Sequence, residues 1–370
     1  MKSVHFLMQQ AVSDKIFPGA ILLVSKSGLV LFNEVYGSAN IFTNQAVTHD
    51  TVFDLASLTK PLATSLAAMI LIKDGQLKLD QTLGSIIPAL MNTPKSEIQV
   101  RHLLSHTSGL PDYRPYYLKI SNFPTKLRKE TLRKYLVNEP LVSSIGKKTI
   151  YSDLGFMMLD WLIEAVSGRR LDQYITKKVY QPLGLTDLFF IDLEDDIPEK
   201  RYAATEKCPW RQRLMNGMVH DDNAFTTGGI AGHAGLFGSA ESIHRLLIEL
   251  LNSYRGVSQK NIFDKNLVRQ FLDRKTMAER ALGFDVPSKE GSCCGDFFKK
   301  EATVGHLGFT GTSFWVDLSQ MIIVILLTNR IHPTRKNERI KTFRPLLHNE
   351  VMKQIYKRSQ GTASALLPST

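Results

Sequence analysis

The sequence predicts an α+β fold in which both ends of the chain contribute strands to one antiparallel sheet flanked by helices. Two strand-like runs near the amino end, at about 20–24 and 29–36, are separated by turn residues and indicate a hairpin. A second hairpin is expected near the carboxyl end, with strands around 313–316 and 321–328. Between the hairpins the apolar residues recur at helical spacing. This order of elements favours a shared sheet with an inserted, mainly helical lobe.

The helical signal is strongest in four segments, three of which stop at or before a glycine: 62–75, 100–109, 153–168 and 239–254. Ser239 is expected to cap the last of them, with Glu241 in its first turn.

These patterns define the expected division of the chain. We predict a discontinuous sheet lobe at 1–75 and 236–356, a mainly helical lobe at 76–235, and a flexible tail at 357–370. A cleft between two such lobes is a natural place for a ligand.

The composition is that of a globular protein, with 43% hydrophobic and 22% charged residues. A net charge of +11 could attract nucleic acid or anionic lipid. However, the densest basic run, 332–345, contains no nucleic-acid-binding motif. We therefore favour a solvated basic surface and expect no nucleic-acid partner.

Residues 1–20 lack the apolar core and cleavage site of a signal peptide, and the apolar run 321–327 is too short to span a bilayer. We therefore expect a cytoplasmic protein without a membrane span. Cys208, Cys293 and Cys294 are odd in number, and two of them are adjacent. This predicts free thiols and no disulfide framework or zinc site, with a redox role for the adjacent pair left open.

Ser57 and Lys60 lie three residues apart at the start of an apolar helix. Residues at this spacing share one helix face, and a serine is a poor nucleophile until a neighbouring base or positive field helps to remove its proton. A buried helix start also offers free backbone N–H groups and a low dielectric. A second copy of the pattern, Ser144 and Lys147, lies in a polar loop and is treated as coincidence. For Ser57, a helix cap beside a surface lysine remains the alternative.

Three further stretches accompany this pair: VRHLLSHTSGLPDY at 100–113, YSDLGF at 151–156 and GHLGFTGTSFWVD at 305–317. Together and in this order, the motifs resemble those of the serine β-lactamase and penicillin-binding protein superfamily. They are most similar to its class C-like branch, which includes D-amino-acid peptidases and family VIII-type esterases. The resemblance covers nearly the whole chain and implies a β-lactamase/transpeptidase-like fold.

The resemblance also implies a role for each matching residue. Ser57 would attack a carbonyl carbon to form an acyl-enzyme, while Lys60 holds and polarises its hydroxyl. Tyr151 would act as general base or as a proton relay, and the choice between Lys60 and Tyr151 as base stays open. The backbone N–H groups of Ser57 and of Phe309, which follows Gly308, would form the oxyanion hole.

Two residues depart from the family pattern. Asp153 replaces the Asn of many class C-like members, so an anion that would pair with Lys60 replaces an amide donor. His306 replaces the usual Lys, so a side chain that is mostly neutral at pH 7 replaces a permanent positive charge. We hypothesise weak recognition of carboxylated substrates such as penicillins, and activity on them that rises as the pH drops through the His306 titration.

The segment 217–240 contains His220, Asp221, Asp222 and His233, which together suggest a metal site, but their spacing matches no zinc pattern. Its glycines would let the backbone lie close to another surface, as a cleft-lining loop requires. We expect His220 and His233 to brace this loop, with substrate contact as the alternative. No metal and no cofactor is predicted.

The leading functional hypothesis is a serine hydrolase that acts through an acyl-enzyme on a small ester, amide or D-amino-acid-containing peptide. A β-lactamase or D-alanyl-D-alanine carboxypeptidase is an alternative, and it is disfavoured because such substrates are met outside the cytoplasm. A non-catalytic binding or assembly protein that retains the fold is an alternative from another class. A small molecule or peptide is the expected partner, and the sequence leaves the oligomeric state open.

Overall fold

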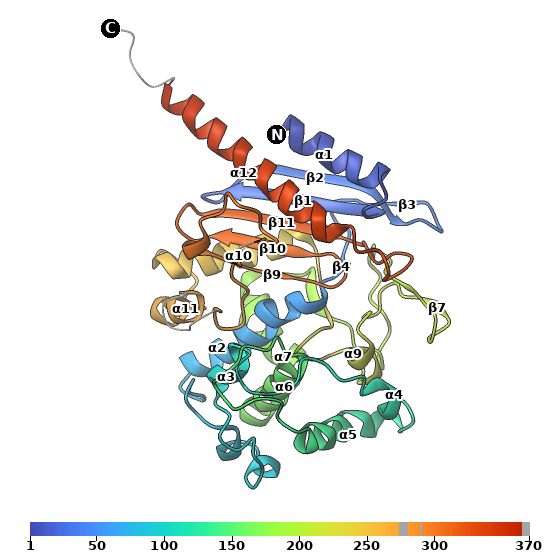
Figure 1. Cartoon of the computed structure of the whole chain (residues 1–370), viewed down its shortest axis with the longest axis vertical. Helices are drawn as coiled ribbons and strands as arrows, with labels where there is room; N and C mark the ends of the chain where they lie inside the picture. Colours follow the sequence, from blue (N-terminus) through green and yellow to red (C-terminus); the bar gives the residue numbers. More distant parts are fainter. Residues whose placement is uncertain (274–279, 289–290, 365–370) are drawn as a thin grey trace.

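The computed structural model describes residues 1–273, 280–288 and 291–364 (Figure 1). Its central feature is an antiparallel sheet with the strand order β3-β2-β1-β11-β10-β9. The two ends of the chain supply its strands: β1 (Gly19–Lys26), β2 (Leu29–Asn40), β3 (Gln45–Ala46), β9 (Thr303–Leu307), β10 (Ser313–Asp317) and β11 (Ile322–Thr328). β1 pairs with β11 from Ala20 opposite Thr328 to Lys26 opposite Ile322. The predicted α+β fold, with one sheet built from both chain ends, is confirmed.

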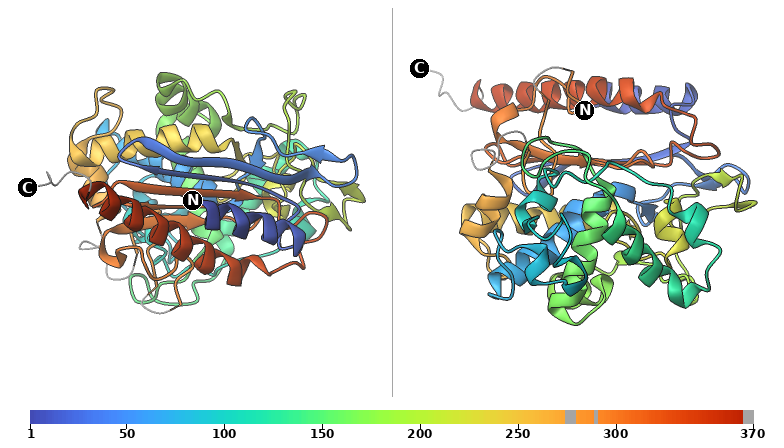
Figure 2. Two further views of the ribbon diagram at one scale, coloured as in Figure 1. Left: turned by 90° about the horizontal axis from the view of Figure 1, so that it is seen from above. Right: turned by 60° about the horizontal axis from the view of Figure 1, so that its bottom comes forward.

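β1 and β11 are continuous apolar runs because both faces of the sheet are covered. Leu22 and Val24 pack in one cluster with residues of α1 (Lys2–Ser13) and α12 (Ile340–Ser364). Ile21 and Leu23, which point to the opposite face, belong to the large core shared with the helical part of the molecule. Figure 2 shows α1 and α12 lying together on the outer face of the sheet.

The remaining helices lie mainly on the inner face of the sheet (Figure 1). They are α2 (Leu66–Lys73), α3 (Val100–Leu104), α4 (Tyr117–Ile120), α5 (Thr125–Asn138), α6 (Asp153–Ser167), α7 (Leu171–Ile175), α8 (Gln181–Leu183), α9 (Asp222–Thr226), α10 (Ala240–Arg255) and α11 (Lys265–Leu272). Short 3-10 and π segments connect them: η1 (Ala56–Leu58), η2 (Lys60–Ser65), η3 (Leu83–Ser85), η4 (Pro88–Leu90), η5 (Thr176–Tyr180) and η7 (Lys300–Ala302).

Among the described residues, two small sheets accompany the central one. One has the order β4-β8-β5, and the other pairs β6 with β7. Their strands are β4 (Phe53–Asp54), β5 (Leu188–Phe190), β6 (Lys207–Cys208), β7 (Arg213–Leu214) and β8 (Leu236–Gly238). The sheet that contains β4 joins the segment just before Ser57 to the segment just after His233.

Local sequence signals account for several helix boundaries. The Ser239 side chain caps α10 by accepting the Ser242 N–H at 3.3 Å, as predicted, and Glu241 lies in the first turn. Gly168 ends α6 in the left-handed conformation with a φ of 65°. By contrast, α12 continues to Ser364, so residues 357–364 of the expected tail are helical, while 365–370 lie outside the described residues. The lobe boundaries remain a prediction.

Two further sequence predictions bear on this structure. Cys208, Cys293 and Cys294 are free thiols, as expected. No helix within 1–273, 280–288 and 291–364 combines the length and the apolar character needed to cross a bilayer.

Candidate active site

Ser57 lies in a tight turn that depends on a buried aspartate. The preceding residue, Ala56, has a φ of 48°, which is a left-handed conformation that residues other than glycine rarely adopt. Asp54 accepts the Ala56 N–H at 2.8 Å through one carboxylate oxygen and the His220 N–H at 2.7 Å through the other. Asp54 therefore stabilises the turn and ties it to the segment that carries His220.

Lys60, at the start of η2, is completely buried. Its Nζ donates to Ser57 Oγ at 3.0 Å and to the His233 carbonyl at 3.1 Å, and it lies 2.7 Å from Asp153 Oδ1. Burial lowers the pKa of the Lys60 ammonium, but the negative charge of Asp153 and the contact with Tyr151 outweigh burial, so the pKa is raised overall. Lys60 is therefore a fixed cation beside the serine at neutral pH.

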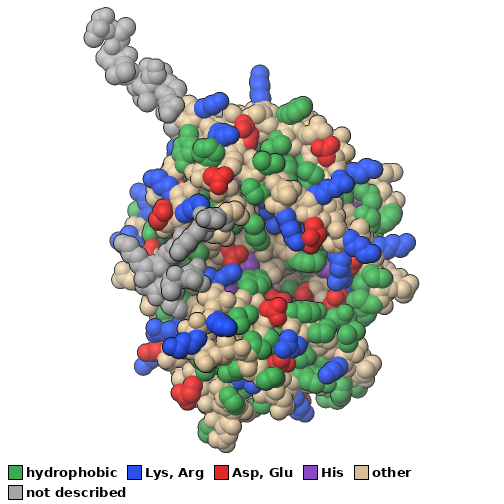
Figure 3. Space-filling model, viewed as in Figure 1, with side chains coloured by type: hydrophobic (Ala, Val, Ile, Leu, Met, Phe, Trp, Pro, Cys, Tyr) green, Lys and Arg blue, Asp and Glu red, His purple; other side chains and the backbone are tan. Residues whose placement is uncertain are grey.

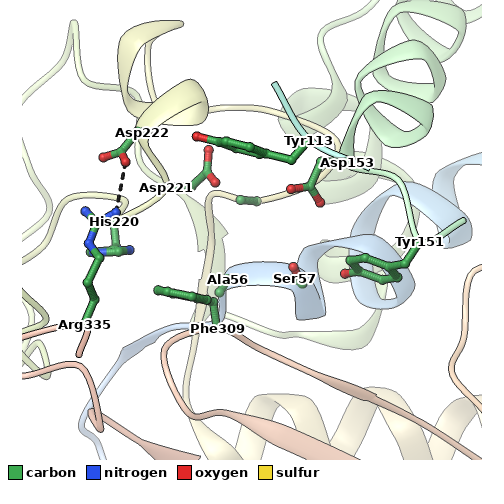
Figure 4. A pocket seen from close by; sticks show the side chains of 11 residues that line it. Ala56, Ser57, Tyr113, Tyr151, Asp153, His220, Asp221, Asp222, Phe309 and Arg335 are labelled. Atoms are coloured by element: carbon green, nitrogen blue, oxygen red, sulfur yellow. Dashed lines mark hydrogen bonds and ion pairs between the residues drawn. The ribbon is translucent and has the colours of Figure 1, made fainter. Parts of the chain in front are cut away.

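Tyr151 lies beside Ser57, and its hydroxyl points toward the serine (Figure 4). The Lys60 Nζ lies 4.9 Å from the centre of the Tyr151 ring. Burial raises the pKa of the Tyr151 hydroxyl, while the charge of Lys60 and a hydrogen bond with Ser57 oppose this rise without cancelling it. Tyr151 therefore keeps its proton at neutral pH.

The segment that carries Tyr151 is held by His106. The His106 Nδ1 accepts the Ser152 N–H at 3.0 Å, and its ring centre lies 4.7 Å from that of Tyr151. Ser152 caps α6 by accepting the Gly155 N–H, which places Asp153 in the first helical turn, where the helix dipole favours a carboxylate. The predicted pairing of Asp153 with Lys60 is present in the structure.

His306 occupies a different environment from the one that the substrate hypothesis assumed. It is buried in β9, its Nδ1 lies 2.9 Å from the Leu307 carbonyl, and its ring centre lies 5.9 Å from that of Tyr151. It is not among the residues that line the pocket beside Ser57. Burial lowers the pKa of His306 to about 4. The rise in activity on carboxylated substrates that was predicted for the His306 titration is therefore expected only well below neutral pH.

Gly308 brings the end of β9 against the nucleophile turn. A Cβ on Gly308 would lie 2.7 Å from the Leu55 carbonyl and 2.1 Å from Thr312 Oγ1, so only glycine allows this approach. The next residue, Phe309, has a half-exposed side chain that lines the pocket. Among the described residues, the backbone N–H groups of Ser57 and Phe309 have no hydrogen-bond acceptor. Both groups are free to bind an oxyanion.

A pocket of about 410 Å³ opens above Ser57 (Figure 4). Tyr151 and Asp153 line one side, Asp221 and Arg335 line the other, and Tyr113 lies between Asp221 and Asp153 (Figure 4). The space-filling view shows this face hollowed near its centre, with acidic and histidine side chains around the hollow (Figure 3).

Most charges in the far wall of this pocket are paired. Arg335 contacts Glu206 at 2.6 Å and Asp222 at 3.1 Å, and Asp222 also contacts the buried Arg211 at 2.7 Å. His220 Nε2 lies 3.0 Å from Glu206 Oε2. These ion pairs and hydrogen bonds stabilise a wall that faces the nucleophile.

The two histidines predicted to lie near the cleft differ in position. His220 lines the pocket and stacks on Phe309, whereas His233 hydrogen bonds to Asp221 at 2.9 Å and offers its carbonyl to Lys60. Both histidines therefore contact other parts of the chain, as expected of residues that brace the loop, and His220 also lies where a substrate would contact it. Within the described ranges there is no group of three or more His, Cys, Asp or Glu side chains that could hold a metal ion.

Sequence reasoning missed four residues of this site: Asp54, His106, Tyr113 and Arg335. His106 and Tyr113 lie within the stretch 100–113, so their place in a recognised motif was an available signal. Asp54 and Arg335 offered none, because their partners His220, Glu206 and Asp222 are more than a hundred residues away.

Comparisons with known proteins identify the family and the fold of this chain. The β-lactamase family model matches residues 7–348. An N-acetylmuramyl-L-alanine amidase of Bacillus subtilis (strain 168) is 32% identical over 350 residues, which cover 85% of this chain and 78% of that protein. A protein of Escherichia coli (strain K12), provisionally named D-alanyl-D-alanine carboxypeptidase, is 30% identical over 88% of this chain and 82% of its own.

Among solved structures, EstCE1, described as a hydrolase with promiscuous acyltransferase activity, superposes with a TM-score of 0.70. The sequence identity is 23%, and the match covers 93% of this chain and 98% of that one. The likeness confirms the β-lactamase/transpeptidase-like fold, and the relatives confirm a β-lactamase-related hydrolase. The chain belongs to the β-lactamase family.

Proposed function

We propose that this protein is a serine hydrolase in which Ser57 forms an acyl-enzyme with a small ester or amide. The observation that carries the proposal is the 3.0 Å hydrogen bond from the buried Lys60 ammonium to Ser57 Oγ, at the base of an open pocket. An accepted hydrogen bond from a cation makes the serine oxygen more acidic and orients its lone pairs. The free backbone N–H groups of Ser57 and Phe309 can donate hydrogen bonds to the negative oxygen of the tetrahedral intermediate.

Tyr151 is assigned the proton transfer. As the Ser57 oxygen bonds to the carbonyl carbon, the serine proton moves to the Tyr151 oxygen, and the Tyr151 proton moves to the leaving atom. The bond between the carbonyl carbon and the leaving atom then breaks. In the second half-reaction, water takes the place of the serine hydroxyl. The water oxygen attacks the acyl carbon, its proton moves to the Tyr151 oxygen, and the Tyr151 proton returns to Ser57 as the acyl bond breaks.

The charges around the pocket favour a substrate without a carboxylate beside the scissile bond. Lys60 is neutralised by Asp153, and Arg335 is neutralised by Glu206 and Asp222. Arg280 lies over the Tyr151 ring but pairs with Asp285. Among the described residues of the pocket no cation is left to pair with a substrate carboxylate, while the Asp221 carboxylate would repel one.

The named relatives favour an amide bond as the substrate. One is an amidase and the other is provisionally a carboxypeptidase, both at identities of 30% or more. A carboxypeptidase must accept a terminal carboxylate next to the bond that it breaks, and the paired charges of this pocket argue against that role. Within the proposed class of substrates, the relatives therefore favour a neutral amide. A cytoplasmic location stays a prediction.

The test is intact-mass spectrometry with a fluorophosphonate probe, benzylpenicillin and p-nitrophenyl butyrate, with ester turnover followed in parallel. Ser57→Ala is expected to lose the fluorophosphonate adduct and at least about 10³-fold of the ester turnover. Ser144→Ala is the matched control, because Ser144 belongs to the second, exposed Ser-x-x-Lys copy and should leave both unchanged.

Faster acylation by benzylpenicillin than by the ester would overturn the proposed substrate class. The absence of any adduct or turnover in the natural chain would instead support a binding or assembly protein that has kept the fold.

A further inference from the structure

Two buried arginines lie behind the turn that presents Phe309. Arg330 follows β11, and Arg344 lies near the start of α12; each is only 5% exposed. The turn between β9 and β10 runs over residues 308–312, and both arginines contact its carbonyl groups. Elsewhere around the site, the buried or half-buried cations pair with carboxylates.

The two arginines donate hydrogen bonds to three carbonyl groups of this turn, including that of Phe309 and that of the residue before it. Arg344 Nη2 donates to the Thr312 carbonyl at 2.8 Å and to the Gly308 carbonyl at 3.4 Å. Arg330 Nε donates to the Phe309 carbonyl at 2.9 Å. The Gly308 carbonyl also accepts the Gly311 N–H at 3.0 Å. These hydrogen bonds fix the orientation of the peptide units of the turn.

The orientation of the Gly308 carbonyl determines where the Phe309 N–H points. In a trans peptide unit the C=O and the following N–H point in opposite directions, and the Gly308–Phe309 peptide is trans. Since the Gly308 carbonyl faces Arg344 and Gly311, the Phe309 N–H faces away from them. Gly308 itself lies against Leu55 and Leu58 of the nucleophile turn. The free N–H is therefore presented from a strand end that touches the turn of Ser57.

The charge of Arg344 adds to this positioning. Among the described residues no carboxylate lies within ion-pair distance of Arg344, and a buried unpaired charge is costly for stability. Burial lowers the pKa of Arg344 to about 10, so the guanidinium keeps its charge at neutral pH. A cation at the carbonyl end of a peptide polarises that peptide and strengthens its N–H as a donor.

We propose that Arg344 is a positioning residue for the oxyanion hole, acting through the Gly308–Phe309 peptide, with Arg330 holding the Phe309 carbonyl. Because an oxyanion exists only in the transition state and the tetrahedral intermediate, Arg344 affects kcat and leaves KM almost unchanged. The inference rests on the proposed function, since it requires Ser57 to form an acyl-enzyme.

The test compares Arg344→Met and Arg344→Lys with the natural chain in the hydrolysis of p-nitrophenyl butyrate. Arg344→Met is expected to lower kcat by about 10- to 100-fold and to change KM by less than about threefold. This decrease in kcat is smaller than the decrease of about 10²- to 10³-fold that follows removal of an oxyanion donor itself. Its affinity for phenylboronic acid, whose serine adduct carries the oxyanion charge, should fall by a similar factor. Arg344→Lys keeps the charge and should recover part of both losses.

Lys341→Met is the matched control. It removes one positive charge from the same helix, at a side chain that is 65% exposed, and should leave kcat and boronate affinity unchanged. If Arg344→Met does not fold, Arg330→Lys carries the same test, because it disturbs the hydrogen bond to the Phe309 carbonyl and should also lower kcat alone.

Unchanged kcat and boronate affinity in a folded Arg344→Met chain, or a loss confined to KM, would overturn the inference. Failure of the proposed function can be distinguished from failure of this inference. If the proposed function is wrong, the natural chain itself will show no fluorophosphonate labelling at Ser57, and both proposals then fail.

Discussion

At the scale of single residues, the Asp153 carboxylate decides the charge state of the site. Lys60 is fully buried, and burial alone would favour its neutral form. The ion pair at 2.7 Å reverses this preference and holds an ammonium against the Ser57 oxygen. An amide at position 153 would not stabilise the ammonium in this way, so the presence of Asp in place of Asn changes the electrostatics around the nucleophile.

Asp153→Asn should therefore move the alkaline limit of activity. In the natural chain the raised pKa of Lys60 keeps the ammonium in place as the pH rises, and activity should be lost only at high pH. In the variant, burial lowers the pKa of Lys60, so the alkaline limb of kcat/KM should shift to lower pH by about 1 to 3 units.

A pH profile of p-nitrophenyl butyrate hydrolysis from pH 5 to 10 tests this, because the natural chain should keep its activity up to pH 10 and Asp153→Asn should lose activity within this range. Asp50→Asn, which makes the same change at a largely exposed carboxylate, should leave the profile where it is. An unmoved alkaline limb in Asp153→Asn would show that Asp153 does not control Lys60.

At the scale of elements, the site depends on the close approach of β9 to η1. The two segments lie about 250 residues apart in the chain, and they meet where Gly308 faces the Leu55 carbonyl. Thr310 and Thr312 add hydrogen bonds from the turn to the carbonyls of Asp54 and Leu55 at 2.7 and 3.1 Å. The position of Phe309 relative to Ser57 follows from these contacts.

Gly308→Ala should separate these elements. The new methyl group would meet the Leu55 carbonyl oxygen and the Thr312 hydroxyl, which is itself hydrogen bonded to that carbonyl, so we expect a loss of about 1 to 3 kcal/mol in the free energy of unfolding, together with a fall in kcat. Urea unfolding and ester turnover measure the two effects.

Gly155→Ala in α6 is the control, because its Cβ would make only ordinary contacts, with a nearest atom at 3.7 Å. Alanine favours a helix over glycine by up to about 1 kcal/mol, so this variant should be as active and at least as stable as the natural chain. Wild-type stability and kcat in Gly308→Ala would contradict the close approach described for β9 and η1.

At the scale of the whole molecule, two buried histidines link stability to pH. His306 lies in the central sheet and His348 in α12, on the other side of that sheet. Burial lowers the pKa of each to about 4, so both are neutral in the folded protein. In the unfolded chain each binds a proton below about pH 6.5. Because the unfolded state binds more protons between about pH 6.5 and pH 4, acidification through this range destabilises the fold.

The free energy of unfolding should therefore fall between pH 7 and pH 4, with each histidine contributing at most about 3 kcal/mol to the decrease. His348→Gln should reduce this decrease, and urea unfolding at pH 7, 5.5 and 4.5 measures it. His49→Gln, at an exposed histidine, should follow the natural chain. Equal losses in His348→Gln and the natural chain would show that His348 does not contribute.

Patterns and motifs in the sequence predicted the shared sheet of the two chain ends, the helices 153–168 and 239–254 with Ser239 as the cap of the second, and the candidate nucleophile with its lysine and tyrosine. These features can be predicted because hydrophobic periodicity, capping residues and short motifs are local signals, which involve residues only a few positions apart. The tertiary structure decided what depends on distant partners: the clamp of Asp54 on Ala56 and His220, the pairing of Arg335, and the helical continuation of α12 to Ser364. It also decided that His306 titrates near pH 4, because the cost of desolvating a charge is set by packing around the side chain and is not encoded in its immediate sequence.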